Sequence, residues 1–411
     1  MFTKNMRNVV KAAVVLGVVA AFLTCGAGPG QAAMLDWKGT TSIDWGMSSN
    51  WNPAGVPGGN DIARWDASSY TRNLETGGTD RSIGQYLFTA NNTGGATIGG
   101  TNKVYINGVY DGTKRIGIMV ESGSGAVTVG KVQALNNAQS WINNSSKLLK
   151  ISNFWKIDRN VTIEGSGTGG VEFSGKYETG GGGGAGGLIV NLPNGVVKII
   201  HYSNEPGRFT GQTSVKQGIL SLGSINDYNV NGTLGYNAWP VILGDNGTTG
   251  TLQYTGGSVS RNRGFTLVAG GTGAFQVGAA GTTLTLSGLI DGDGGLSKAG
   301  AGTLTLSNAA NSYTGDTTVS AGTLQVVSDF FDDSSSVYIA SGVLNLNHAS
   351  MDTILYLYLG SVMQAAGTYN ASNTPAYLGG TGSLSVTMPE PATLALMVLG
   401  GVGLVLGRKR K

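Results

Sequence analysis

The chain has little charge and almost no cysteine or histidine, and each shortage argues against a class of function. Charged residues make up 12% of its 411 residues, about half the usual ~25%, which suits an extracellular protein better than a cytosolic enzyme. Its two histidines, His201 and His348, lie far apart. No Ser/His/Asp set, metal-ligand spacing or phosphate-binding loop stands out around them. The sequence therefore predicts no enzyme, no cofactor and no metal site.

The positive charge lies mainly at the two ends of the chain. Seven of the 26 Lys and Arg residues lie there, with one of the 23 acidic residues, Glu390. The rest of the chain holds 19 positive and 22 negative charges, a net of −3. It lacks the basic surface by which proteins bind nucleic acid, so we expect no nucleic-acid partner.

Glycine is what the chain has in abundance. It accounts for 70 of the 411 residues, far above the usual ~7%, without the Gly-X-Y period of collagen. Together with many Thr, Asn and Ser residues, this composition favours short strands joined by tight turns. Between residues 67 and 273 we find no stretch of ten or more residues with a helical period.

A regular spacing of apolar residues predicts how these strands are arranged. Two series recur every twenty residues: Leu284, Leu304, Leu324 and Leu344, and Leu286, Leu306, Val326 and Leu346. Leu384 and Val386 fall two further steps along. Residues two apart face the same side of a strand, so each ~20-residue turn would stack one apolar pair on the next. The spacing predicts an all-β fold, a parallel β-helix or β-solenoid, with outward-facing Thr303, Thr305, Thr323 and Gln325.

The same stretch resembles a known repeat. Residues 294–326 follow the pattern GGLxKxGxGTLxLxxxxxxYTGxTxVxxGTLxV, which is similar to the autotransporter-associated β-strand repeat, also called the passenger-associated transport repeat. Residues 209–222 form a poorer copy that aligns with residues 313–326. The resemblance implies an exported bacterial β-helix and says little about activity. We find no series of alternating ~10-residue strands like those of an autotransporter's membrane barrel, so we do not expect transport through a barrel of its own.

Weaker repeats fill the rest of the predicted solenoid body, residues 67–387. We expect rungs at Val104–Ile106, residues 116–118, residues 127–129, residues 161–163 and residues 171–173, because each alternates and is bounded by Gly, Asn or Asp. Residues 180–187 are nearly pure glycine and are expected to form a flexible surface loop. Residues 256–273 are expected to be a turn-rich passage between rungs.

Residues 1–33 have the parts of a secretory signal peptide. Lys4, Arg7 and Lys11 precede a twelve-residue apolar run, which is too short to be a comfortable membrane span. Small residues follow, so we expect signal peptidase to cut after Ala32 or Ala33. The only cysteine, Cys25, would be discarded with the signal, leaving neither disulfides nor cysteine-ligated metal. Lipidation of Cys25 is the alternative, which fits poorly because Thr precedes it.

Four tryptophans gather in residues 34–66, at Trp37, Trp45, Trp51 and Trp65. The segment resembles the N-terminal entry segment of the same class of surface proteins. We expect a cap whose indoles cover the open end of the solenoid, since terminal repeats need such covers. The alternative is an exposed aromatic surface that binds sugar.

The last segment, residues 388–411, has three parts in a fixed order. Pro389, Glu390 and Pro391 precede sixteen uncharged residues, 392–407, and the chain then closes on Arg408, Lys409, Arg410 and Lys411. Sixteen helical residues span ~24 Å of a ~30 Å hydrocarbon core, and long basic side chains can close part of the gap. The order resembles a PEP-CTERM sorting signal, which implies recognition by an exosortase, a membrane transpeptidase, and cleavage near Pro389–Pro391. A plain tail anchor is the alternative.

Acidic residues cluster at Asp291 and Asp293, and again at Asp329, Asp332 and Asp333. Oxygen ligands such as these can hold Ca²⁺, but neither spacing matches a known calcium loop. We therefore expect solvated turns.

These features together predict an exported, non-enzymatic protein of the cell surface or extracellular matrix, with a structural or adhesive role. It would be anchored transiently in the cytoplasmic membrane by its C-terminal helix. The expected partners are signal peptidase, an exosortase, and exopolysaccharide or other surface components. Two alternatives stay open: a polysaccharide-degrading β-helix enzyme, suggested by fold analogy alone, and a carbohydrate-binding surface module.

Overall fold

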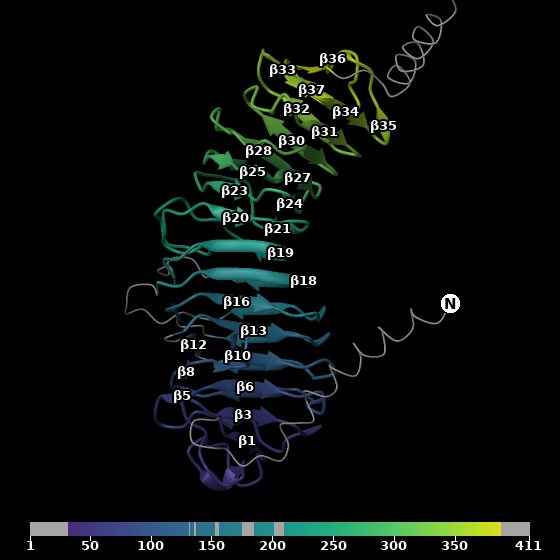
Figure 1. Ribbon diagram of the computed structural model, residues 1–411. Coiled ribbons are helices and arrows are strands. Elements are labelled where there is room, and N and C mark those ends of the chain that lie inside the picture. The colour runs from purple at the N-terminus through teal and green to yellow at the C-terminus, as the bar shows by residue number, and fades with distance from the viewer. Residues whose placement is uncertain are drawn as a thin grey trace, which may run out of the picture.

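The protein is an elongated stack of short strands (Figure 1). The computed structural model describes residues 32–130, 132–134, 137–152, 156–174, 185–200 and 209–387. The stack runs from β1 (Met34–Trp37) at one end to β37 (Leu378–Gly380) near the other, and its colour changes steadily along its length. The chain therefore builds the stack turn by turn, as the twenty-residue spacing predicts, and the all-β solenoid fold is confirmed.

The strands form three parallel columns, because each turn supplies strands that pair with their equivalents in the next turn. The first column contains β1, β3 (Ile62–Trp65), β6 (Gln85–Phe88), β10 (Arg115–Val120), β13 (Gln139–Asn143), β16 (Val161–Glu164), β20 (Val241–Leu243), β23 (Phe265–Leu267) and β26 (Ile290–Asp291). The second contains β4 (Leu74–Glu75), β7 (Ala96–Gly99), β11 (Val127–Gly130), β14 (Leu149–Ser152), β17 (Val171–Ser174), β21 (Thr249–Tyr254), β24 (Thr272–Val277), β27 (Gly295–Ala299), β29 (Thr317–Val319), β31 (Ser336–Ile339) and β34 (Tyr356–Leu359).

Two long strands, β18 (Leu188–Ile199) and β19 (Thr213–Leu222), run through both of these columns and join them into one sheet. The third column is split in two. Its first part contains β5 (Arg81–Ile83), β8 (Val104–Ile106), β12 (Val132–Ala134) and β15 (Lys156–Ile157). Its second part contains β22 (Val259–Arg261), β25 (Thr283–Leu286), β28 (Thr303–Leu306), β30 (Thr323–Val326), β32 (Val343–Leu346) and β37.

The predicted stacking of leucines is found in the third column. Leu284, Leu304, Leu324 and Leu344 are aligned in neighbouring strands, and none of these side chains is more than 1% exposed. Burying each contributes about 1.5–3 kcal/mol, and the contiguous interior holds the stack together. Thr303, Thr323 and Gln325 lie on the outer face and are partly exposed. Thr305 was also expected to face solvent, but it is only 8% exposed.

The twenty-residue step fails at the C-terminal end. Leu344 pairs with Leu378, thirty-four residues along, and not with a residue of the predicted series. Leu384 instead pairs with Asp352 of β33 (Met351–Ile354), within β38 (Ser383–Val386). The reason is that the last turn contains extra chain, including β35 (Val362–Met363) and β36 (Gly367–Asn370).

Turns in the N-terminal half are longer than twenty residues because their loops are longer. Tyr86 pairs with Ile118, thirty-two residues along, and Ile163 pairs with Val190, twenty-seven along. The five rungs expected between residues 104 and 173 are nevertheless strands, and they are confirmed as β8, β10, β11, β16 and β17. The turn-rich passage expected at residues 256–273 is wrong, because β22, β23 and the start of β24 lie there.

Antiparallel strands close both ends of the parallel stack. At the N-terminal end, β2 (Trp51–Asn52) pairs antiparallel with β1, after a short 3₁₀ helix η1 (Ser48–Asn50). At the C-terminal end, β35 pairs antiparallel with β34, and β36 with β38. A further antiparallel strand, β9 (Val109–Tyr110), forms a hairpin with β10. These pairings use backbone groups that an open strand edge would offer to another chain.

No helix in the described part of the chain is long and apolar enough to cross a membrane. The predicted membrane segment, residues 392–407, lies outside the described residues. So do residues 1–31 of the predicted signal peptide and residues 180–184 of the predicted glycine-rich loop.

Candidate functional surfaces

The four N-terminal tryptophans lie inside the molecule. Trp45 and Trp51 are fully buried, and Trp37 and Trp65 are at most 3% exposed. Trp51 contacts the other three, with ring centroids 5.2 Å from Trp37, 5.2 Å from Trp45 and 6.1 Å from Trp65. Because such edge-on contacts fill the interior of the first turns, the cap interpretation fits these residues. The alternative of a sugar-binding surface made by these indoles is wrong, since none is available to a ligand.

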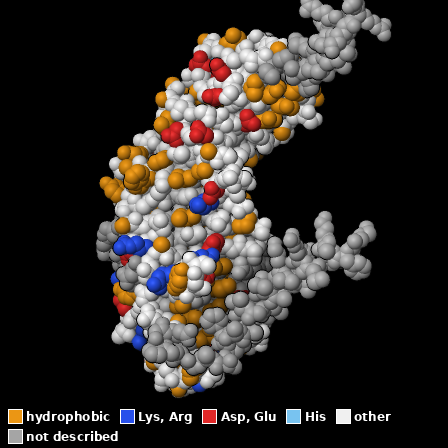
Figure 2. Space-filling model, viewed as in Figure 1, with side chains coloured by type: hydrophobic (Ala, Val, Ile, Leu, Met, Phe, Trp, Pro, Cys, Tyr) orange, Lys and Arg blue, Asp and Glu red, His pale blue; other side chains and the backbone are white. Residues whose placement is uncertain are grey.

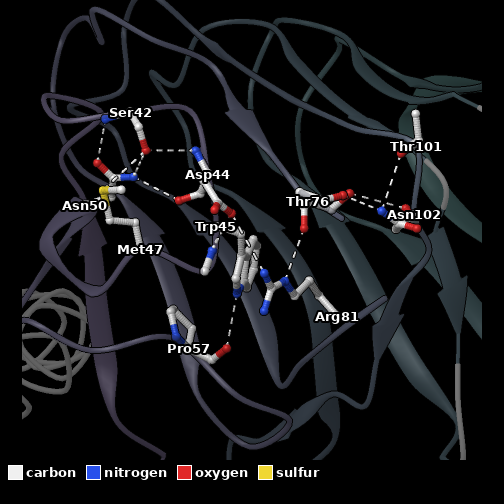
Figure 3. A network of polar contacts seen from close by, with 12 residues as sticks. Ser42, Asp44, Trp45, Met47, Asn50, Pro57, Thr76, Arg81, Thr101 and Asn102 are labelled. Atoms are coloured by element: carbon white, nitrogen blue, oxygen red, sulfur yellow. Dashed lines mark hydrogen bonds and ion pairs between the residues drawn. The ribbon is translucent and has the colours of Figure 1, made fainter. Parts of the chain in front are cut away.

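Hydrogen bonds fix the cap around these rings (Figure 3). The Trp45 indole N–H donates to the Pro57 carbonyl at 3.3 Å. The Trp51 indole N–H donates to the Trp45 carbonyl at 3.0 Å. The buried Asn50 side chain donates to the Ser42 hydroxyl at 2.9 Å and to the Asp44 carbonyl at 2.8 Å. Buried polar groups need such partners, so this network maintains the shape of the cap.

The repeat segment contains buried polar residues that hold its turns. The Lys298 ammonium donates to the carbonyls of Ala299, Gly300 and Ala321 at 2.8, 2.8 and 3.1 Å. Burial lowers the pKa of Lys298 to about 8. The Tyr313 and Thr317 hydroxyls, both buried, are hydrogen-bonded at 2.7 Å. The Lys of the repeat pattern therefore fastens one turn to the next, and the Tyr and Thr hold the chain within a single turn; sequence reasoning assigned neither role.

The acidic residues accept hydrogen bonds from nearby hydroxyl and amide groups, and Asp291 does so within β26, where a solvated turn was expected. Asp291 accepts a hydrogen bond from the Thr266 hydroxyl at 2.7 Å, and Asp293 accepts one from Thr314 at 3.2 Å. Asp332 accepts the Ser334 amide at 2.9 Å, and hydrogen bonds from Ser334 lower its pKa. Among the described residues, no three His, Cys, Asp or Glu side chains are placed to hold a metal ion.

Sequence reasoning missed a buried carboxylate beside the second cluster. Asp352 is 4% exposed and accepts the Phe331 amide at 3.0 Å. Burial, together with the nearby carboxylates of Asp329 and Asp333, raises the pKa of Asp352 to about 6. An aspartate in the middle of a Met-Asp-Thr-Ile strand gives no signal in the sequence that it faces inward.

Neither ring nitrogen of His348 has a hydrogen-bond partner in the described part of the chain. His348 follows β32 and packs beside Gly382, while its carbonyl accepts the Thr381 hydroxyl at 2.8 Å. His201 lies outside the described residues.

Several outer-face charges form ion pairs between neighbouring turns, such as Lys150 with Glu172 and Lys216 with Asp245, each at 3.0 Å. Figure 2 shows scattered charges on one face of the molecule, with no single dense cluster.

The predicted signal-cleavage site lies beside the N-terminal end of the stack, and the described residues end shortly before the predicted sorting motif. Ala32 and Ala33 immediately precede β1; the Ala33 amide donates to Asp61 Oδ1 at 3.2 Å, and the Ala33 carbonyl accepts the Ile62 amide at 2.7 Å. At the other end, the Thr387 amide donates to the Ile354 carbonyl at 3.2 Å. The predicted motif residues begin two positions later and lie outside the described residues: Pro389, Glu390, Pro391, Arg408, Lys409, Arg410 and Lys411.

One exposed aromatic loop escaped sequence reasoning. Residues 223–240 connect β19 to β20, and within them Tyr228 and Tyr236 are each 48% exposed and Trp239 is 60% exposed. The signal in the sequence was the spacing of these rings among Asn and Gly residues. It was overlooked because the denser tryptophan cluster lies in the N-terminal segment.

Comparison with known proteins matches two separate segments of the chain. Residues 296–326 match the passenger-associated-transport-repeat family, and residues 389–411 match the PEP-CTERM protein-sorting motif. Both resemblances seen in the sequence are therefore confirmed. Over 98 residues the chain is 42% identical to the "Adhesin BmaC autotransporter" of Brucella suis biovar 1 (strain 1330). That match covers 23% of this chain and 3% of the adhesin. No solved structure matches the chain significantly.

Proposed function

We propose that this is an exported, non-enzymatic surface protein whose solenoid presents an adhesive face and whose C-terminal segment is processed by an exosortase-type transpeptidase. The observation that carries the proposal is the joining of two modules. A solenoid containing a transport-type repeat ends at β38, and a sorting motif begins two residues after Thr387. The similarity to an adhesin supports the adhesive role.

The joint determines how the body would be held at the membrane. Thr387 is still hydrogen-bonded to the last turn, and Met388 alone separates it from Pro389. A motif next to a membrane would therefore hold the C-terminal turn near the bilayer surface. Strands in a column are ~4.8 Å apart, so a column of about a dozen strands is ~60 Å long. The N-terminal cap would lie at the outer end when the stack stands upright.

Pro389 and Pro391 have fixed φ angles and lack amide protons, which favours an extended segment outside the following apolar run. Such a segment is accessible to a transpeptidase. Glu390, the charged residue between them, would be the polar group that the enzyme recognises. The basic residues Arg408, Lys409, Arg410 and Lys411 would stay on the cytoplasmic side and set the depth of the segment.

The test is to express an epitope-tagged chain in the native host, as the full sequence, without residues 389–411, and as Glu390→Ala. We expect the full chain at the cell surface, with a mass that ends near Pro389–Pro391. The Glu390→Ala chain should stay unprocessed and membrane-bound. Glu75→Ala, on the exposed surface of β4, is the matched control and should be processed normally. A mature chain that still ends at Lys411 would contradict sorting and leave a plain tail anchor.

A further inference from the structure

The loop between β19 and β20 places three aromatic rings at the surface. Tyr228, Tyr236 and Trp239, which we call the aromatic platform, are about half exposed, and Val230 beside them is 49% exposed. In Figure 2 hydrophobic side chains gather at the left edge of the molecule, at the height of β19 and β20 in Figure 1. A cluster of large exposed apolar groups is typical of a binding surface.

A buried arginine holds this loop in one shape. Arg263 is fully buried, and its guanidinium donates to loop groups on both sides. Nη1 donates to the carbonyl and side-chain oxygens of Asn237 at 3.0 and 2.9 Å, and Nη2 donates to the Asp227 carbonyl at 3.0 Å. A fixed guanidinium fork that binds several carbonyls strongly limits the conformations of the loop.

Two asparagines complete this framework from within the loop. Asn226 donates to the Gly235 carbonyl at 2.9 Å and accepts the Leu234 amide at 2.8 Å. Asn237 donates to the Gly211 carbonyl at 2.9 Å, which ties the loop to the solenoid. Both asparagines are buried, so their bonds are shielded from competition with water.

The backbone of every ring in the platform is fixed. The Tyr228 amide donates to Asn262 Oδ1 at 2.8 Å, the Tyr236 amide to the Phe209 carbonyl at 3.0 Å, and the Trp239 amide to Asn237 Oδ1 at 3.2 Å. The Asn229 amide donates to the Asn237 carbonyl at 3.1 Å, which places the backbone next to Tyr228 beside the backbone next to Tyr236. A loop backbone held in this way loses little conformational freedom when a ligand binds.

The chemistry of the platform favours a sugar. Tyr and Trp rings combine an apolar face with a hydrogen-bonding O–H or N–H group, which matches the C–H faces and hydroxyls of a hexose. Charge near the rings is balanced, because the Asp227 carboxylate lies 3.5 Å from the Arg261 guanidinium and Arg263 is buried. A neutral ligand therefore fits better than an anionic one.

The size of the platform argues against a stable dimer. Three half-exposed rings, of ~150–250 Å² each, offer roughly 300 Å² of contact area. A stable protein interface needs about 800 Å² from each partner. A polysaccharide gains affinity differently, because one long polymer can contact the platforms of many chains displayed together.

We propose that the aromatic platform binds a neutral polysaccharide, with Tyr228, Tyr236 and Trp239 stacking against its sugar rings. The proposal rests on the proposed function in one respect, because export would bring the platform to extracellular polymer. It names the ligand class of the adhesive face, and binding can be measured independently of sorting.

The test is affinity electrophoresis of the purified full-length chain in gels containing hydroxyethyl cellulose, dextran or galactomannan, with alginate as an acidic polymer. We expect retardation by at least one neutral polymer, a loss of affinity of about fivefold or more for Trp239→Ala, and no retardation for the triple alanine variant. Tyr110→Ala, which removes another exposed ring (59%) far from the loop, should bind like the unchanged chain. Arg263→Met, checked for an intact solenoid by its melting temperature, should also lose affinity although all three rings remain.

Binding that Trp239→Ala leaves unchanged, retardation only by alginate, or no retardation by any neutral polymer would overturn the proposal. Sedimentation of the same variants tests whether a second copy of the chain occupies the aromatic platform instead. A dimer that Trp239→Ala dissociates would identify that second copy as the partner and would also overturn the proposal. Failure of sorting is distinguishable, because Glu390→Ala should still bind polymer and Trp239→Ala should still be cut near Pro389–Pro391.

Discussion

Leu304 of β28 is aligned with Leu284 of β25 in the adjacent turn, and both side chains are at most 1% exposed. Leu304→Asp would therefore place a carboxylate in the apolar interior without a partner. We expect it to lower the free energy of unfolding by at least about 3 kcal/mol, or to bind a proton in place of ionising. Urea unfolding measures the loss.

The matched control is Thr303→Asp, the neighbouring residue on the outer face of the same strand. Its side chain is partly exposed, so we expect a change of about 0.5 kcal/mol or less. Thr305 is unsuitable as a control because it is only 8% exposed. Equal losses in the two variants would contradict the inward and outward faces of β28.

The register of β28 could be predicted because four successive strands in this region follow one another at three equal steps of twenty residues, and each carries a leucine followed two residues later by Leu or Val. Leu384 was placed wrongly because a periodic pattern carries no information about inserted chain, and the last turn holds two additional strands. The sequence pattern also failed to indicate β22 and β23, because each strand has only three residues. Arg263 between them has the character of an exposed loop residue, although it is buried and holds the 223–240 loop from inside.

The buried tryptophans of the cap illustrate why a binding surface could not be predicted from the sequence alone. The sequence showed four aromatic residues in the N-terminal segment but not which way they face, since indoles suit both an interior and a binding surface. Burial of Trp45 and exposure of Trp239 depend on what covers each ring. One neighbour of Trp45 is Tyr86 of β6, whose ring centroid lies 6.1 Å away, and a contact so distant along the chain is absent from local sequence patterns.

Asp352 should make stability depend on pH in the opposite direction to an ordinary paired carboxylate. Its pKa is raised to about 6 in the folded chain, against about 4 in the unfolded chain. Between these values the folded state binds more protons, so the contribution of this group is fully present below pH 4 and falls as pH rises to 6. The side chain of the Asp352→Asn variant cannot ionise, but it can still accept a hydrogen bond from the Phe331 amide. We expect the free energy of unfolding of this variant, relative to that of the unchanged chain, to increase by about 1–2 kcal/mol from pH 4 to pH 7.

Asp332→Asn is the control for this titration. The pKa of Asp332 is lowered by hydrogen bonds from Ser334, so its contribution is present above the ordinary pKa and lost at lower pH. The two variants should therefore show opposite trends when melting temperature is measured from pH 3 to pH 7. A flat difference for Asp352→Asn would show that this carboxyl is not perturbed.

The mature N-terminus is expected to be Ala33. A cut after Ala32 leaves small residues at the two positions that signal peptidase reads, Ala32 and Gly30. The new α-ammonium of Ala33 would lie at Asp61 Oδ1, 3.2 Å from the backbone nitrogen, and would gain a charge-assisted hydrogen bond. A cut after Ala33 would instead remove the carbonyl that accepts the Ile62 amide. N-terminal sequencing of the exported chain decides between Ala33 and Met34, and a lipidated Cys25 at the N-terminus would refute both.

The last prediction concerns the N-terminal cap. Trp51 is fully buried, donates to the Trp45 carbonyl and contacts three other indoles, so Trp51→Ala should cost about 3–5 kcal/mol locally. In a stacked fold each turn contacts only its neighbours, and the loss should therefore act on the first turns without loosening the distant end. Hydrogen exchange should show faster exchange in β1, β3 and β6, with β28, β30 and β32 protected as before. Trp239→Ala removes an exposed indole and should leave exchange in both regions unchanged. Uniformly faster exchange along the whole solenoid in Trp51→Ala would show that the stack unfolds as one unit and that the cap controls all of it.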